Sequence, residues 1–344
     1  MKPFVSIIVP CRNEASFIRG ALDSLLGNAY PRERFEIIIV DGMSTDATSN
    51  IADEYEKRYP FVRCLRNPKQ TAAAALNLGF AKARGDIIMR ADAHAVYPSN
   101  YVEGLVNALL CSAADNVGPL WITEPANDSP SARAIALALR HPFGVGNARF
   151  RIGARERCWV DTVPFGCYRR SVFERIGLFD EDLIRNEDDE FNLRLIRNGG
   201  RILLVPDITV RYYARDSLGK LARMYYQYGY FKPLVVRKLG AVMTWRQVVP
   251  SLFLLALICF GTFATWNGIA RIGLLGLLAV YLAVVVVCAA QAAFGLNVRC
   301  AAALCCAFVL MHISYGLGFI NGCRVFLLRL HYKSPGSANM PISR

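Results

Sequence analysis

The sequence predicts an α/β domain with a mostly parallel β-sheet, followed by a C-terminal membrane segment. Two observations lead to this prediction. Short β-branched runs alternate with helix-like segments over residues 5–92, which is typical of a parallel sheet flanked by helices. After Val248, three uncharged apolar stretches follow one another, each close to the ~20 residues that a transmembrane helix needs.

The first part of the domain contains four predicted strands. Val5–Pro10 is a β-branched run that a proline ends, and a second apolar run predicts a strand over 35–40. Apolar spacing predicts a helix over 14–26, and Thr45 or Asp46 can cap the next helix, which runs to about Tyr59. The remaining segments are a strand at 62–65, an alanine-rich helix at 71–84 and a strand at 86–92.

The second part, from 117 to 202, has a less regular pattern. Residues 142–155 are rich in glycine and arginine, which is typical of a loop. A strand is expected at 165–168, and helices are expected at 171–176 and 187–198. We place the end of this domain at about residue 240, so that the domain covers residues 1–240.

The C-terminal part is predicted to lie on and in a membrane. Aromatic and basic residues over about 217–238 predict an amphipathic helix at the membrane surface. Apolar spans at 248–266, 272–294 and 301–320 predict about three transmembrane helices, in a membrane domain covering 248–320. The basic tail at 321–344 favours the same side of the membrane as the basic run before Val248. Three spans would separate the two, so either one span is re-entrant or the first basic run dominates.

The formal net charge is +13, which fits a nucleic acid, an anionic lipid or a phosphorylated substrate as a partner. Six lysines and arginines lie from Asp216 to Arg246, directly before the first apolar span. This position favours the lipid bilayer as the partner and not nucleic acid. The alternative is an ordinary solvated helix face.

The cysteines and the N-terminus indicate the compartment. The 11 cysteines include no CxxC pair, and several lie in or beside apolar spans. They are typical of small buried residues in a reducing compartment. No signal-peptide pattern precedes the first strand. We therefore expect a multi-pass protein of the inner (plasma) membrane, with the α/β domain in the cytoplasm.

Polar segments stand at the carboxyl ends of three predicted strands, where ligands bind in sheets of this kind. They are Pro10–Glu14, Asp41–Asp46 and Asp92–His94. Asp92 and His94 point the same way from an extended backbone, and both can bind Mn²⁺, while a carboxylate also suits Mg²⁺. The alternative is that either residue caps a turn. Asp41 is placed to accept hydrogen bonds from a ribose or a base, whereas a turn and a helix cap explain Asp46.

Four consecutive acids, Glu187–Glu190, begin a predicted helix. Acids at a helix N-terminus complement the helix dipole, which is the ordinary explanation. Four acids exceed what capping needs, so one carboxylate can face a cleft and act as a general base.

Taken together, these segments resemble the family 2 inverting glycosyltransferases of the GT-A fold. The matching segments are VSIIVPCRNE (5–14), VDGMSTDAT (40–48), GDIIMRADAH (85–94) and NEDDEFNLRL (186–195). The resemblance covers roughly residues 3–235. It is closest to the succinoglycan-biosynthesis glucosyltransferase branch, through RADAHA, FGCYRR and the C-terminal spans.

The resemblance implies a nucleotide-sugar site that contains Pro10, Glu14, Asp41 and Asp92. Where the family often has a second acid after Asp41, this chain has Gly42. The family's DxD motif matches Asp92, with the histidine two residues later in place of the second acid. Asp92 and that histidine, His94, would therefore hold a divalent cation, Mg²⁺ or Mn²⁺.

The resemblance also implies roles near the acceptor. The family's ED motif matches Glu187-Asp188, so that Asp188 would be the catalytic base. Glu187 and Gln227 would contact the acceptor or a phosphate. Processive relatives carry a Q-x-x-R-W motif, and the segment that starts at Gln227 lacks its arginine and tryptophan. This departure implies the addition of one sugar per encounter.

The implied activity is transfer of a hexose, glucose from UDP-glucose, to a polyprenyl-diphosphate-linked saccharide in exopolysaccharide biosynthesis. Other polysaccharide-assembly enzymes are further expected partners. A polyprenyl-monophosphate glycosyltransferase and a non-catalytic, nucleotide-sugar-binding membrane protein remain as alternatives. A transporter is disfavoured, because three spans are few and the large α/β domain would have no role.

Overall fold

The structure is a computed structural model that describes residues 1–240 and 247–327. The chain forms two compact units. An α/β unit comprises residues 1–122 and 149–212, and a helical unit comprises residues 123–148, 213–240 and 247–327.

The α/β unit is built on one nine-stranded sheet. Its strands are β1 (Val5–Cys11), β2 (Phe35–Asp41), β3 (Val62–Arg66), β4 (Ile87–Arg90), β5 (Ala95–Val96), β6 (Asn116–Glu124), β7 (Cys158–Trp159), β8 (Cys167–Arg169) and β9 (Ile202–Tyr213). They pair in the order β3-β2-β1-β4-β8-β6-β9-β5, and β7 pairs with β9. The first four strands of this order are parallel, and β8 is antiparallel to both β4 and β6.

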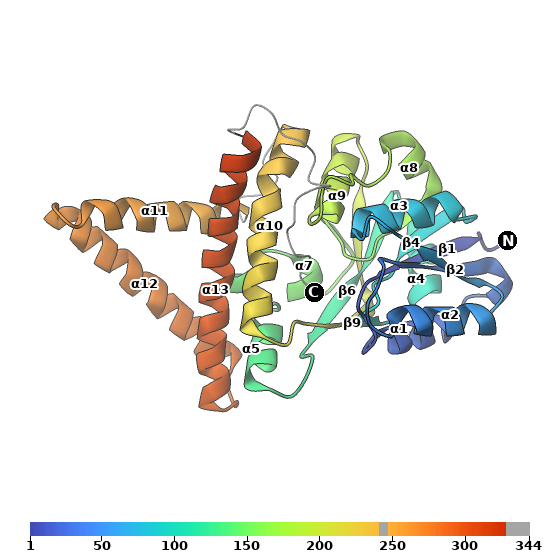
Figure 1. Ribbon diagram of the computed structural model, residues 1–344, viewed down its shortest axis with the longest axis horizontal. Helices are drawn as coiled ribbons and strands as arrows, with labels where there is room; N and C mark the ends of the chain where they lie inside the picture. The colour runs from blue at the N-terminus through green and yellow to red at the C-terminus, as the bar shows by residue number, and fades with distance from the viewer. Residues whose placement is uncertain (241–246, 328–344) are drawn as a thin grey trace. The chain divides into compact units, whose positions relative to one another are not determined.

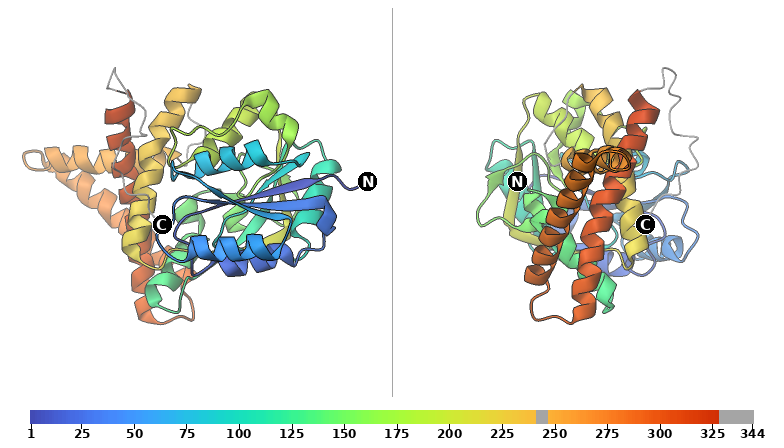
Figure 2. Two further views of the ribbon diagram at one scale, coloured as in Figure 1. Left: turned by 45° about the vertical axis from the view of Figure 1, so that its right-hand side comes forward. Right: turned by 90° about the vertical axis from the view of Figure 1, so that its left-hand side faces the viewer.

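Helices cover both faces of this sheet (Figures 1 and 2). The helices of the α/β unit are α1 (Ile18–Leu26), α2 (Thr48–Arg58), α3 (Ala72–Lys82), α4 (Tyr101–Leu110), α7 (Arg149–Ile152), α8 (Arg170–Ile176) and α9 (Glu187–Arg197), with a 3₁₀ turn at Arg32–Arg34. Apolar residues of α1, α2 and α4 share one core, and those of α3, α8 and α9 share the other. The predicted α/β class is therefore confirmed, although the sheet is parallel over only part of its width.

The two cores explain why the central strands are apolar at successive positions. In β1, Ile7 lies in one core and Ile8 lies in the other. In β2, Ile37 and Ile38 divide in the same way. Successive side chains of a strand point to opposite faces, so a strand covered on both sides has no polar face.

Two local differences from the sequence prediction concern the site. The strand predicted at 86–92 ends at Arg90, so Asp92 and His94 lie in the turn that follows it. The segment predicted as a loop at 142–155 contains two one-turn helices, α6 (Pro142–Val145) and α7. A proline in the first turn of α6 suits a helix start, because proline fixes φ near its helical value.

The helical unit contains α5 (Pro130–Ala138), α6, α10 (Leu218–Leu239), α11 (Val249–Phe263), α12 (Gly268–Ala292) and α13 (Val298–Gly322), followed by a π-helical turn at Cys323–Leu327. The helix predicted over about 217–238 is α10, and it lies beside α13 (Figures 1 and 2). Glycines allow this close approach. A Cβ added at Gly229 would lie 2.1 Å from the Tyr315 carbonyl oxygen, and one at Gly318 would lie 2.1 Å from that of Tyr226.

Two helices of this unit are long and apolar enough to cross a membrane. They are 268–292 and the continuous helix over 298–327, which contain 18-residue stretches with mean hydropathies of 2.8 and 1.9. Many of their large apolar side chains are exposed, including Ile269 and Ile272. The remaining predicted span, at 248–266, corresponds to α11, whose 15 residues would rise only about 22 Å. From residue 328 on, the predicted basic tail lies outside the described residues, as does Arg246.

Candidate active site

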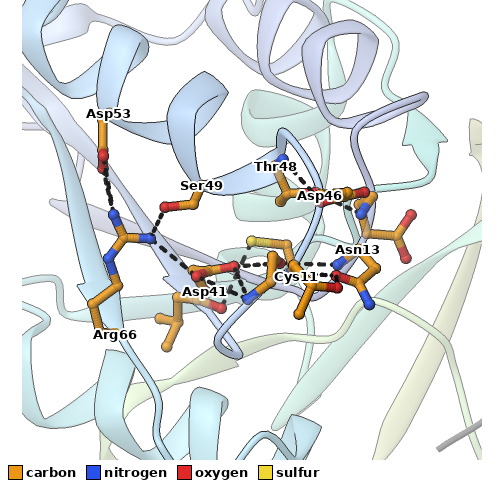
Figure 3. A network of polar contacts seen from close by, with 12 residues as sticks. Cys11, Asn13, Asp41, Asp46, Thr48, Ser49, Asp53 and Arg66 are labelled. Carbon is orange, nitrogen blue, oxygen red and sulfur yellow. Dashed lines mark hydrogen bonds and ion pairs between the residues drawn. The ribbon is translucent and has the colours of Figure 1, made fainter.

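The loops after β1 and β2 are tied to each other at the carboxyl end of the parallel strands (Figure 3). The Asn13 N–H donates to Ser44 Oγ at 2.9 Å, and the Thr45 N–H donates to the Asn13 side-chain oxygen at 2.8 Å. The Glu14 N–H donates to Thr48 Oγ1 at 2.6 Å. These bonds fix the first two predicted site segments against each other.

Asp41 lies at the centre of this network and is 1% exposed (Figure 3). Its carboxylate accepts hydrogen bonds from the Ser44 N–H at 3.3 Å and from Arg66 Nη1 at 3.0 Å. The same guanidinium binds Asp53 at 2.9 Å. The N-cap of α2 is Ala47 and not Thr45 or Asp46 as predicted, but the Asp46 carboxylate just before it accepts the Thr48 N–H at 2.9 Å and the Ala15 N–H at 3.1 Å.

A largely buried arginine joins the last two predicted segments. Arg90 Nε donates to Asp92 Oδ1 at 2.9 Å, and Arg90 Nη1 donates to Glu187 Oε1 at 3.1 Å. The three side chains are 15%, 15% and 7% exposed, so water screens these charges poorly. Segments almost a hundred residues apart in sequence therefore converge on one guanidinium.

The two carboxyls on Arg90 differ in their affinity for a proton. Burial acts to raise the pKa of Asp92, but the charge of Arg90, with smaller contributions from His94 and Arg185, outweighs it and lowers that pKa. Burial and then the neighbouring Asp188 carboxylate raise the pKa of Glu187, against the opposing charge of Arg90. Paired carboxyls whose pKa values are driven apart are a common feature of catalytic sites.

His94 contacts a different partner. Its Nδ1 lies 3.3 Å from Glu14 Oε1, and its ring meets the Tyr212 ring edge-on, with centroids 5.1 Å apart. Glu14 therefore links the loop after β1 to the turn after β4. The structure brings Glu14 and His94 together, as it does Asp92 and Glu187.

The remaining predicted residues lie in three places. Pro10 is in β1 and pairs in register with Val40 of β2, one position before Asp41. Asp188 is in the first turn of α9, and its carboxylate acts electrostatically on Arg90. Gln227 is buried on α10 in the helical unit.

Sequence reasoning missed the arginines that organise the site. Arg90 had a detectable signal, because it is a charged residue at the end of an apolar strand and two positions before an acid. Arg66, at the end of β3, had a weaker signal in the sequence. Neither signal predicts which carboxylates the arginine binds, since most of these come from other strands and helices.

Left-handed backbone also gathers at this end of the sheet. The non-glycine residues with positive φ among those described are Asn13, Met43, Gln70, Phe165 and Asn186. They follow β1, β2 and β3, precede β8, and precede α9. Such conformations carry a cost and concentrate at functional sites, where the surrounding structure holds them.

A sequence model of the family "Glycosyl transferase family 2" matches residues 6–177, which is half of the chain. This chain belongs to glycosyl transferase family 2. The match ends before Glu187, so it does not include the acids at the start of α9.

Two relatives are similar to this glycosyltransferase over most of their length. "Succinoglycan biosynthesis protein ExoA" from Rhizobium meliloti (strain 1021) is 32% identical, over 78% of this chain and 81% of the relative. A Methanococcus voltae protein is 30% identical, over 73% of this chain and 80% of the relative. It is named a dolichyl N-acetyl-alpha-D-glucosaminyl phosphate 3-beta-D-2,3-diacetamido-2,3-dideoxy-beta-D-glucuronosyltransferase.

Solved structures agree on the fold of this glycosyltransferase. Mannosyltransferase PcManGT from Pyrobaculum calidifontis, in complex with GDP-Man and Mn²⁺, has a TM-score of 0.55 at 19% identity, over 95% of this chain and 88% of that one. A crystal structure of S. aureus TarS has a TM-score of 0.51 at 17% identity, over 90% and 89%. The chain therefore has the GT-A fold, together with two C-terminal helices that could span a membrane.

Proposed function

We propose that this glycosyltransferase moves a hexose, glucose from UDP-glucose, onto a lipid-linked saccharide with inversion, in exopolysaccharide biosynthesis. The observation that carries the proposal is the largely buried Asp92–Arg90–Glu187 cluster, with Asp188 next to Glu187 in the chain. The names of the two relatives, one in succinoglycan biosynthesis and one acting on a dolichyl-linked sugar, support the choice of acceptor.

In the proposed reaction, Asp188 takes the proton from the acceptor hydroxyl. The acceptor oxygen forms a bond to the anomeric carbon while the bond from that carbon to the diphosphate oxygen breaks. The nucleoside diphosphate leaves with the electron pair, and the configuration inverts. Arg90 holds Asp92 and Glu187 in place, so that neither carboxylate has to reorganise during the step.

A divalent cation, Mg²⁺ or Mn²⁺, fits this site if the donor completes it. The described residues contain no group of three His, Cys, Asp or Glu side chains able to hold a metal by themselves. Asp92 is nevertheless a suitable oxygen ligand, because its lowered pKa keeps it ionised. His94 stands two residues away. Such cations often bind one or two carboxylates together with substrate phosphates. When bound, the cation would neutralise charge on the leaving diphosphate.

The nucleotide would bind at the loops after β1 and β2, at Pro10, Glu14 and Asp41. Asp41 is held there in a fixed orientation by Arg66. Gly42 follows it, and a Cβ at that position would lie 3.3 Å from the Arg12 Cβ. A second acid at position 42 would therefore crowd Arg12 and partly neutralise it.

The bilayer is the proposed location of both the enzyme and its lipid-linked acceptor. Two helices of membrane-spanning length in the same chain support this proposal. We place the α/β unit on the cytoplasmic side of the inner membrane, where nucleotide sugars are made. Gln227 on α10 is proposed to contact the acceptor or a phosphate, and further polysaccharide-assembly enzymes are proposed partners.

The test is transfer of radiolabelled sugar by the purified full-length chain in detergent. The reaction contains UDP-glucose, Mn²⁺ or Mg²⁺, and a lipid extract with polyprenyl-diphosphate-linked sugar. We expect metal-dependent transfer that falls about 10²- to 10⁴-fold in Asp188→Asn, the usual contribution of a general base. Asp189→Asn, in the same helical turn, is the matched control and should retain activity.

Other results would change the proposal. Full activity in Asp188→Asn would remove the assigned base. Transfer from another nucleotide sugar only would replace glucose as the donor. Measurable UDP binding without transfer from any common nucleotide sugar would favour the non-catalytic alternative. The anomeric configuration of the product, read by NMR, tests inversion separately.

A further inference from the structure

Arg151 of α7 lies in the glycine- and arginine-rich segment 142–155, to which the proposed function gives no role. Its guanidinium carbon is 4.5 Å from the centroid of the Trp121 ring and 5.4 Å from that of Tyr212. Its Nη1 is buried, and no hydrogen-bond partner for it exists among the described residues. No described carboxylate forms an ion pair with it either.

This situation differs from that of neighbouring arginines. Arg157, two residues after this segment, binds Asp207 at 3.0 Å, and Arg175 binds Asp115 at 2.6 Å. An aromatic ring attracts a guanidinium, but it satisfies none of the N–H donors. A buried donor without an acceptor is costly, and more so when it carries charge. Arg151 is therefore a cation that aromatic rings hold in place, and its Nη1 donor has no acceptor among the described residues.

The aromatic support of Arg151 continues to the candidate active site. Trp121 and Tyr212 are stacked, with centroids 4.2 Å apart and planes inclined by 6°. Tyr212 in turn meets the ring of His94, which lies beside Glu14. One tyrosine ring thus touches both Arg151 and the turn that contains Asp92. All these residues belong to the α/β unit.

We propose that Arg151 is a phosphate-binding residue of this site. The inference rests on the proposed function for the identity of the substrates. A guanidinium offers parallel N–H groups that match two oxygens of a phosphate, and its planar group can stack on an aromatic ring at the same time. The phosphate belongs either to the nucleoside diphosphate of the donor or to the diphosphate of the lipid acceptor.

The test measures binding without turnover, so it does not depend on transfer. The full-length chain in detergent is titrated with UDP, with uridine, and with a polyprenyl diphosphate in mixed micelles. Arg151→Gln removes the positive charge. Arg151→Lys keeps the charge but lacks the parallel N–H groups of a guanidinium. Arg157→Gln removes an exposed arginine two residues after the segment and serves as the control. The thermal midpoint of each variant reports whether it folds.

If the donor supplies the phosphate, the Kd for UDP should rise about 10- to 100-fold in Arg151→Gln, while the Kd for uridine is unchanged. If the acceptor supplies it, only the Kd for the polyprenyl diphosphate should rise. Arg151→Lys should fall between the wild type and Arg151→Gln, and Arg157→Gln should match the wild type.

Two results would overturn the inference. The first is an unchanged Kd for both diphosphates in a folded Arg151→Gln variant. The second is an equal loss of affinity for uridine and UDP in both Arg151 variants, which would mean that the arginine only supports the local structure. A failure of sugar transfer with Arg151-dependent UDP binding would instead contradict the proposed function and leave this inference standing.

Discussion

The two ends of the parallel strands both hold a buried carboxylate beside arginines, yet the two carboxylates differ in how well they are satisfied. At the amino end, Glu36 of β2 is 0% exposed and accepts hydrogen bonds from Ser6 Oγ at 2.7 Å and the Arg84 N–H at 2.8 Å. Its other oxygen accepts from Arg63 and Arg84 at 2.8 and 3.1 Å.

The consequence is an opposite shift in proton affinity. At Glu36, burial acts to raise the pKa, but the bonds from Ser6 and the Arg84 N–H and the arginine charges outweigh it and lower that pKa. At Glu187, at the other end, burial and Asp188 outweigh Arg90 and raise the pKa. The surroundings of Glu36 thus stabilise its negative charge, whereas those of Glu187 disfavour it.

The largest expected effect is at Arg90. Arg90→Gln leaves Asp92 and Glu187 buried without the cation that joins them. Removing one partner of a buried ion pair costs about 3–5 kcal/mol. The thermal midpoint of the full-length chain in detergent should fall strongly, and UDP binding and transfer should be lost. Arg90→Lys keeps the charge and should recover part of the stability. A wild-type midpoint in Arg90→Gln would contradict the bridging role.

Glu36→Gln should be next in size. It weakens several charge-assisted hydrogen bonds, each worth about 1.5–3 kcal/mol, while its two arginines can turn to water. Because the folded pKa is lowered, the stabilisation exists above the unfolded pKa of about 4.3 and disappears as the pH falls through the folded value. The midpoint deficit should therefore be full at pH 7 and shrink below about pH 4. The activity of the folded protein should not change.

Glu187→Gln should act in the opposite direction. Because the folded pKa is raised, this carboxyl contributes stability below the unfolded pKa of about 4.3 and loses it as the pH rises through the folded value. Without added metal, the variant should melt above the wild type at pH 8, and the difference should vanish near pH 4. Transfer activity should fall. A lower midpoint than wild type at pH 8 would mean that the bond to Arg90 outweighs burial.

Arg84→Gln should have the smallest effect. Its side chain is 65% exposed, and Glu36 keeps Ser6, Arg63 and the backbone N–H of residue 84. Exposed ion pairs contribute about 0–1 kcal/mol, so the midpoint should hardly move. A loss as large as that of Glu36→Gln would show that this arginine carries the amino-end cluster.

The alternation of strands and helices over residues 5–92 and the family could be predicted from the sequence. Alternating apolar runs predict two-sided burial because each strand exposes side chains to both faces, as Ile7 and Ile8 do. Parallel strands place their carboxyl ends at one edge, so Asp41 and Asp92 were expected to share a site. These inferences depend on local periodicity and on topology alone.

The pairings depend on tertiary structure. A sequence shows that Arg90 and Glu36 are charged residues within apolar strands, but not which groups face them. Glu36 meets Ser6 from the neighbouring strand and Arg84 from the turn before another, while Arg90 meets α9 almost a hundred residues later. Whether a buried carboxyl holds or resists its charge is decided by such partners, because desolvation and nearby charges oppose each other at similar strength. The opposite pKa shifts of Glu36 and Glu187 thus follow from how the chain packs.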